Sequence, residues 1–169
     1  MNKETKTRED YLKMVKENGY SLEFIPKEYI DKELCLEAVK SNGRALEYVP
    51  EELKDREICF EAVRNYNYAL RFVPKNYFTE ELCIGLILAN ARLIEYIPEE
   101  FVNKNLCIKL VKRNGLILEY IPNHLIDKDI CLEAVKVNAG LAIKFVPKEY
   151  IDKEICDEAS KSFYRDLGL

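Results

Sequence analysis

Hydrophobic residues return at regular positions along this chain. In residues 32–42, apolar side chains occupy the third, fourth, seventh and eighth positions after Asp31, as Leu34, Cys35, Ala38 and Val39. This spacing places them on one face of an α-helix. Later segments repeat the pattern, each after a residue whose side chain can cap a helix, and the pattern predicts a series of amphipathic helices. The capping residues are Thr7, Asp31, Asp55, Thr79, Asn103, Asp127 and Asp152.

A second pattern lies between these helices. It consists of an aromatic residue, then Ile or Val, then Pro, as in residues 48–50. Proline lacks an N–H and disfavours helix at the preceding residue, so a short helix should end there and a new turn should begin. The aromatic residues are expected in the core. They are Phe24, Tyr48, Phe72, Tyr96, Tyr120 and Phe145.

The two patterns recur with a period of 24 residues, and once of 25. All six prolines and all six cysteines follow this period. A fixed period of this length is typical of solenoids, in which each unit buries its apolar face against its neighbours. The sequence therefore predicts an all-α solenoid of six repeats. Prolines lie at 26, 50, 74, 98, 122 and 147, and cysteines at 35, 59, 83, 107, 131 and 156.

The repeats divide the chain into three parts. Residues 1–19 are predicted to be a capping helix, because they match only the second half of a repeat and carry a polar edge at Asp10. Residues 20–163 hold the six repeats, and residues 164–169 are a predicted tail. The last repeat has one extra residue within 139–143, where we expect a bulge. Asn-Gly and Asn-Ala pairs after the long helices are expected to end them in a left-handed conformation.

The amino-acid composition argues against some classes of function. The net charge of −4 and a pI near 5.3 argue against general nucleic-acid binding and against binding to a membrane surface. The N-terminal residues lack a signal-like apolar core, and there is no apolar run long enough to cross a bilayer, so we expect a cytoplasmic protein.

No sequence motif predicts a disulfide, a metal or cofactor site, or a catalytic site. The cysteines occupy equivalent positions of stacked helices, about 8 to 10 Å apart, which is too far for disulfides, so all six are expected to be reduced and buried. There is no C-x-x-C pair, and His124 is the only histidine, so neither a metal site nor a cofactor is predicted. Without a paired nucleophile or a phosphate loop, we predict no catalytic residues and a protein that is not an enzyme.

The third repeat departs from the pattern. Where four other long helices carry opposite charges at the sixth and ninth positions, it has Gly85 and Leu88. Leu88 is expected to be exposed. Just before this helix come Arg64, Tyr66, Tyr68 and Arg71, and such residues beside an apolar surface are enriched in binding hot spots. These six residues form the predicted binding site.

The repeat unit resembles a known family. Residues 45–65, which read A-L-E-Y-V-P-E-E-L-K-D-R-E-I-C-F-E-A-V-R-N, are similar to tandem repeats classed as a domain of unknown function in bacteria, protists and large viruses. The resemblance implies an all-α repeat fold and no activity or substrate. Alternating long and short helices are also similar in outline to the leucine-rich variant repeat.

Two functions follow as hypotheses. The first is a non-enzymatic scaffold or adaptor that binds another protein, or a second copy of itself, through the third repeat. The alternative is a protein that binds a nucleotide or another small ligand, with Tyr66 and Tyr68 stacking on a ring and Arg64 and Arg71 neutralising an anion.

Overall fold

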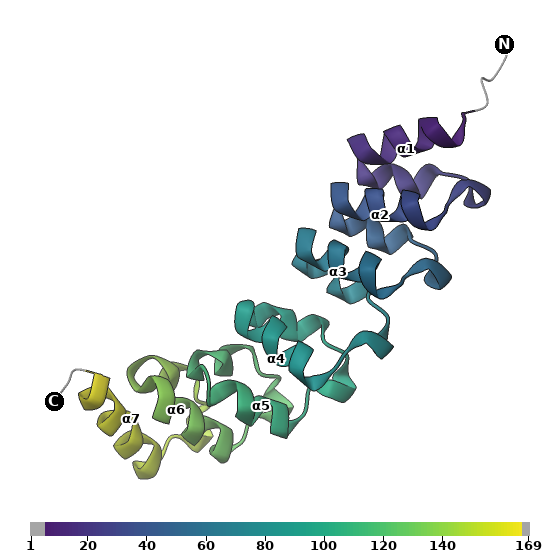
Figure 1. Cartoon of the computed structure of the whole chain (residues 1–169). Coiled ribbons are helices and arrows are strands. Elements are labelled where there is room, and N and C mark those ends of the chain that lie inside the picture. Colours follow the sequence, from purple (N-terminus) through teal and green to yellow (C-terminus); the bar gives the residue numbers. More distant parts are fainter. Residues whose placement is uncertain (1–5, 167–169) are drawn as a thin grey trace. The chain divides into compact units, whose positions relative to one another are not determined.

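The structure is a computed structural model that describes residues 6–166, except for the side chains of 139 and 162–166. It is an all-α repeat solenoid, and no strand occurs among the described residues. The chain divides into two compact units, residues 1–77 and 78–169 (Figure 1), and each unit is described by itself.

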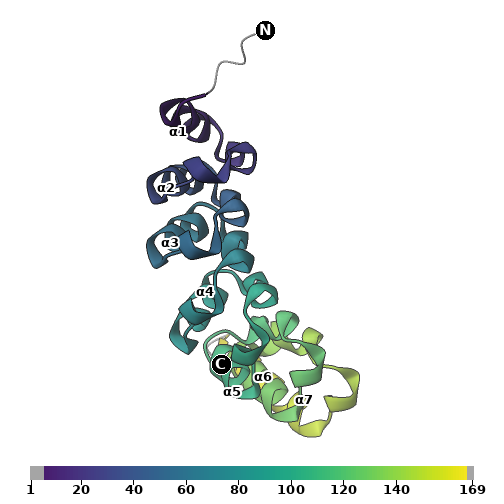
Figure 2. The ribbon, with the colours of Figure 1, turned by 90° about the vertical axis from the view of Figure 1, so that its right-hand side faces the viewer.

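In the first unit, long α-helices alternate with 3₁₀-helices. Figure 2 shows the long helices on one side and the 3₁₀-helices on the other. The predicted short helix is a six-residue 3₁₀-helix, and the turn that begins at proline is a second, three-residue one. The elements are α1 (Arg8–Glu17), η1 (Gly19–Phe24), η2 (Lys27–Tyr29), α2 (Lys32–Ser41), η3 (Gly43–Tyr48), η4 (Glu51–Leu53), α3 (Arg56–Asn65), η5 (Asn67–Phe72) and η6 (Lys75–Tyr77).

The second unit repeats this order, with a change at the predicted bulge. There, α6 continues through the connection to Ala142 and is broken at Asn138, whose φ of −133° and ψ of 57° are not helical. The last helix reaches Asp166, three residues into the predicted tail. The elements are α4 (Glu80–Ala89), η7 (Ala91–Tyr96), η8 (Glu99–Phe101), α5 (Lys104–Val111), η9 (Gly115–Tyr120), η10 (Asn123–Leu125), α6 (Lys128–Ala142), η11 (Ile143–Phe145), η12 (Lys148–Tyr150) and α7 (Lys153–Asp166).

Side-chain caps begin all seven long helices, as predicted. Asp55 Oδ1, for example, accepts a hydrogen bond of 2.9 Å from the N–H of Ile58. Thr7 and Asp10 cap each other reciprocally at the start of α1. These bonds satisfy N–H groups that have no partner within the helix. The remaining acceptors are Asp31, Thr79, Asn103, Asp127 and Asp152.

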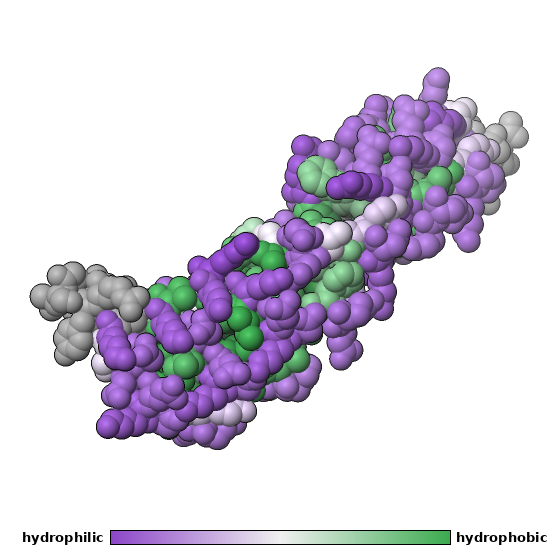
Figure 3. Space-filling model, turned by 60° about the horizontal axis from the view of Figure 1, so that its bottom comes forward, coloured by the Kyte–Doolittle hydropathy of each residue, from purple (hydrophilic) through white to green (hydrophobic). Residues whose placement is uncertain are grey.

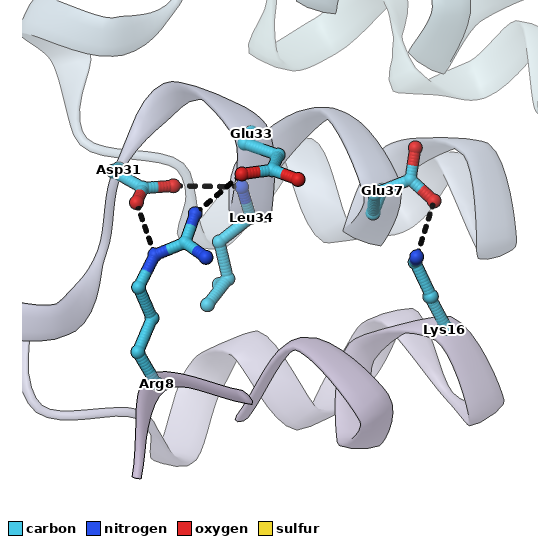
Figure 4. Close-up of polar contacts among 6 residues, drawn as sticks. All are labelled: Arg8, Lys16, Asp31, Glu33, Leu34 and Glu37. Carbon is cyan, nitrogen blue, oxygen red and sulfur yellow. Dashed lines mark hydrogen bonds and ion pairs between the residues drawn. The ribbon is translucent and has the colours of Figure 1, made fainter. Parts of the chain in front are cut away.

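Most of the capping aspartates also pair with the preceding long helix. The Arg8 side chain at the start of α1 reaches Asp31 at 2.7 Å and Glu33 at 2.6 Å (Figure 4). Lys32, Lys104 and Lys128 repeat this arrangement toward the next helix in their own units. These side chains are exposed, so each pair adds little stability, but together they fix the register of adjacent helices.

The two apolar stripes of each long helix face different neighbours. In α7, Ile155 and Ala159 at positions three and seven are buried against the preceding helix, whereas Cys156 at position four is exposed. In α1 the pattern reverses, with Val15 at position eight buried and Asp10 at position three exposed. Positions three and seven therefore face the preceding long helix, and positions four and eight face the following one.

The prediction of left-handed helix ends was wrong. Asn18, Asn42, Asn90 and Asn114 are extended, with φ between −151° and −153°. Each side chain caps the next 3₁₀-helix instead, as Asn42 Oδ1 does by accepting from Arg44 N–H at 3.1 Å. The asparagine is thus the start of a new helix, for which an extended N-cap is normal.

The glycines after three long helices permit a close backbone approach. A Cβ added at Gly43 would lie 2.3 Å from the carbonyl oxygen of Ala62, and one at Gly19 or Gly115 would meet the next long helix at 2.2 Å. Gly43 N–H also donates to Asn65 Oδ1 at 2.8 Å.

The aromatic residues of the 3₁₀-helices are not fully buried, contrary to expectation, although Tyr48 and Phe72 pack against the core. Phe24 is 75 % exposed, and its five equivalents are partly buried. The core is instead aliphatic and lies between the long and short helices, with Leu22, Leu46 and Leu118 among the fully buried residues. The aromatics end their 3₁₀-helices one residue before the buried Ile or Val, which turns them toward the surface.

We expect opposite effects from adding a methyl group at two glycines. Gly43→Ala should destabilise the protein by more than 1 kcal/mol, because the backbone of Ala62 leaves no room for a Cβ. Gly85→Ala should stabilise it by about 0.5 to 1 kcal/mol, because the site is open and helical glycine is entropically costly. Urea denaturation of both variants measures the difference. Equal stabilities would contradict the close approach at Gly43.

The contribution of Asp55 to stability as a helix cap can be separated from its contribution through the ion pair with Lys32. Asp55→Ala should cost about 0.5 to 2 kcal/mol, because the N–H of Ile58 loses its acceptor. Asp55→Asn keeps an acceptor but not the pair with Lys32, so it should cost less. Thermal and denaturant melts measure both variants, and an equal loss would mean that the ion pair outweighs the cap.

Candidate functional site

The outer surface of α4 lacks the charges of its counterparts. Gly85 is exposed, and no atom lies within 4 Å of where its Cβ would be. Leu88 is partly buried, so it is less exposed than expected. Leu82 and Ala89, three residues before and four after Gly85, are also exposed, and Leu82 reaches 41 %. One face of α4 is therefore neutral, and we call these four residues the α4 surface.

The equivalent positions of four other long helices, α2, α3, α6 and α7, carry ion pairs. Lys40 lies 3.1 Å from Glu37, and Lys136 lies 2.7 Å from Glu133. Arg64 pairs with Glu61 and Lys161 with Glu158 in the same way. The charged side chains nearest in sequence to the α4 surface are Glu81, which is exposed and directly precedes Leu82, and Glu80, which pairs with Lys109 of α5 at 2.6 Å.

The other four predicted site residues lie in the first unit, on α3, on η5 and at the connection between them. Arg64 is on α3, paired with Glu61. Tyr66 connects α3 to η5, and its ring centre is 5.5 Å from that of Tyr68. The guanidinium of Arg71 lies 5.5 Å from the ring centre of the adjacent Phe72. The structure thus brings the two tyrosines together, with Arg71 on the same 3₁₀-helix as Tyr68 and Arg64 on α3.

The cation at the tyrosines is Arg44, which the sequence analysis did not select. Its guanidinium lies 5.1 Å from the ring centre of Tyr66. Hydrogen bonds from this group to Tyr66 and Tyr20 raise the pKa of Arg44. The repeat pattern could have suggested the contact between Arg44 and Tyr20, because the two residues occupy equivalent positions of adjacent repeats.

A further apolar row was missed on the long helices. Position five carries Leu12, Leu36 and Phe60 in the first unit, and Phe60 is 65 % exposed. Ile84, Ile108 and Leu132 continue the row in the second unit. Hydrophobic atoms accordingly reach the surface between charged side chains in each unit (Figure 3). The signal was present in the sequence, as an apolar residue directly after the cysteine, or after Tyr11 in the capping helix.

Five of the six cysteines are buried, and all six are free thiols. Burial raises the pKa of Cys35 to about 12 and those of Cys59, Cys83, Cys107 and Cys131 to about 11. Cys156 is exposed, which corrects the expectation that all six are buried. It occupies position four of α7, where the stripe faces away from α6.

The described residues offer little chemistry of other kinds. No group of three or more potential metal ligands occurs among them. A shallow hollow beside α7 is lined by charged residues such as Lys128 and Asp152, and these two already pair with each other at 2.7 Å. In the described part of the chain, no helix is both long and apolar enough to cross a bilayer.

Comparison with known proteins identifies the family. The model of a domain of unknown function, DUF4116, matches residues 31–78, 79–126 and 103–151. Each match covers about two repeats, and together they cover most of the chain. The chain belongs to the DUF4116 family. No curated protein and no solved structure matched it. The DUF4116 match confirms the predicted resemblance to a tandem-repeat family and assigns no activity.

Thiol labelling should divide the cysteines of this DUF4116 protein into two classes. At about pH 8, Cys156 should react quickly, and the five buried cysteines should react only after denaturation, because thiols that are buried and protonated are poor nucleophiles. Mass spectrometry after alkylation, with and without denaturant, identifies the modified residues. Rapid labelling of Cys35 or Cys107 in the native protein would mean that position four does not face the next helix.

Proposed function

We propose that this protein is a non-enzymatic helical-repeat module that binds another protein through the α4 surface. The DUF4116 repeats are compatible with a scaffold. The proposal rests on the one helix whose outer surface departs from the repeat. Stacking accounts for residues that recur in every unit, whereas Gly85 and Leu88 replace a recurring ion pair.

Folding alone gives no reason for Gly85, and it accounts for Leu88 only in part, because that side chain is partly buried. A glycine within a helix costs about 1 kcal/mol relative to alanine, and Gly85 makes no close contact that would require it. A charged residue would suit the exposed position better. A flat, neutral helix surface without a long side chain does allow another protein to approach closely. Burial by a partner of the area of Leu82 and Leu88 that is still exposed would contribute a part of the about 1.5 to 3 kcal/mol that complete burial of a leucine is worth.

The nucleotide-binding alternative has less support. It needs Arg64 and Arg71 near the tyrosines, but Arg64 is paired with Glu61 and Arg71 lies against Phe72. The cation over Tyr66 is Arg44, so an anion at the tyrosines would have to be neutralised by that side chain. This alternative stays a prediction, and thermal-shift measurements with a panel of nucleotides would test it.

Two substitutions at Gly85 test the main proposal. Gly85→Glu restores the charge typical of position six, and Gly85→Ala adds a neutral methyl group of little bulk. Both fit the open site, so both variants should fold. In affinity capture from cells that contain the native protein, Gly85→Ala should retain the partner, and Gly85→Glu should weaken its capture at least tenfold. Sedimentation of the purified protein distinguishes a second copy from a different partner.

The outcome is decisive in either direction. Proteins captured with Gly85→Ala and lost with Gly85→Glu support the α4 surface. If both variants capture the same proteins equally, the α4 surface is not the binding site. Denaturation curves of the two variants, recorded in parallel, confirm that a loss of binding does not arise from unfolding.

A further inference from the structure

The outer surface of α4 differs in charge from that of every other long helix. α4 begins the second unit (Figure 1), and residues 82–91 contain no charged side chain. A helix that is apolar around most of its circumference is normally covered on all sides, but Gly85 and Leu82 are exposed within the unit. Each of the other long helices has a charged residue at both the sixth and the ninth position. These residues are Lys13, Glu37, Glu61, Lys109, Glu133 and Glu158 at the sixth position, and Lys16, Lys40, Arg64, Lys112, Lys136 and Lys161 at the ninth.

The sequence around Gly85 is apolar in the same way in both directions. Leu82 and Leu88 lie three residues before and after Gly85, and Ile84 and Leu86 lie one residue before and after it. When a helix packs antiparallel against its own copy, a two-fold axis beside Gly85 brings each residue level with the one equally far on the other side. Leu82 of one copy is then level with Leu88 of the other. This symmetry suits α4 to a reversed copy of itself.

The missing charges favour a second copy over a different protein. Residues beside a two-fold axis meet their own equivalents, so a charge in place of Gly85 would face the same charge. A different partner can offset a charged surface with opposite charges, but a second copy cannot do so at the axis. Neutral residues at positions 85 and 88 are therefore what a two-fold contact through α4 requires.

The exposed carboxylate of α4 does not oppose this arrangement. Glu81 lies four residues before Gly85, so each Glu81 is level with Ala89 at the end of the other helix. The two Glu81 residues are then about 12 Å apart along the helix axis, at about 1.5 Å per residue, which exceeds the Debye length of about 8 Å at physiological salt. The positive end of each helix dipole also lies beside the negative end of the other.

The nearest cations of α5 are paired within the unit. Lys109 lies 2.6 Å from Glu80, and Lys112 lies 3.6 Å from Glu133. The approach of two copies at α4 therefore brings together ion pairs, and not free cations, at these two positions of α5.

We propose that two copies of this chain pair through α4, with the two helices antiparallel about a two-fold axis at Gly85. This inference rests on the proposed function, because it assigns a partner to the α4 surface. Two glycines at the axis allow the helix backbones to approach closely, and the long charged residues at the sixth position of the other helices do not. One pair of crossing helices is smaller than the about 1,200 to 2,000 Å² that stable interfaces bury, so the dimer should be weak and depend on concentration.

Sedimentation velocity of the purified full chain from about 1 to 100 µM measures this pairing. We expect the average mass to rise from that of a monomer toward that of a dimer. Gly85→Glu and Gly85→Lys both fill an open site, so both variants should fold. Each should weaken the pairing at least tenfold, because equal charges meet at the axis. An equimolar mixture of the two variants should restore the dimer, because glutamate then faces lysine.

Glu133→Lys is the matched control. It changes the charge at the sixth position of α6, in the same unit but away from the proposed axis. Its ion pair with Lys136 is exposed, so its loss should cost little stability, and the variant should pair as the native chain does. Denaturation curves of all three variants confirm that a loss of pairing does not arise from unfolding.

Three results would overturn the inference. The native chain could remain a monomer over the whole concentration range. The mixture of Gly85→Glu and Gly85→Lys could remain monomeric, which would mean that the two copies do not meet at residue 85. Glu133→Lys could weaken the pairing as much as Gly85→Glu does. A monomeric chain that captures another protein, and loses it with Gly85→Glu, would overturn the pairing and still support the proposed function, so the two can fail separately.

Discussion

Burial of each long helix against the next is the interaction on which the structure depends. A single repeat has only one helix of about ten residues and two short 3₁₀-helices, and it cannot enclose an apolar core. Residues such as Leu34 and Ile58 become fully buried only because the neighbouring helix covers them. The same dependence explains Cys156, which occupies a core position of the repeat but is exposed on the outer side of α7.

Close packing also determines where small residues are needed and which polar groups must be paired. Gly43 lets η3 begin against the backbone of Ala62, and a larger residue would separate the two elements. The capping aspartates then act twice. Asp55 satisfies the first turn of α3 and receives Lys32 from α2, so one carboxylate begins a helix and positions its neighbour. Individually these contacts are weak, and their repetition makes the register reliable.

Residues that stacking does not explain are the ones that point to function. On α4 the departure is a missing ion pair, which leaves Gly85 and the leucines around it neutral. A repeat fold makes such a departure visible, because the other repeats supply the comparison.

The sequence by itself determined the repeat period, the long helices and their caps. These features depend on local chemistry, such as Asp55 accepting from Ile58, and on a periodicity that three-dimensional packing must respect. The tertiary structure decided which side each residue faces. The sequence could not show that Phe24 is exposed or that Arg44, and not Arg64, lies over Tyr66, because these outcomes depend on how adjacent repeats meet. Asn42 shows the same limit, since its role as an N-cap appears only when the following segment is seen as a 3₁₀-helix.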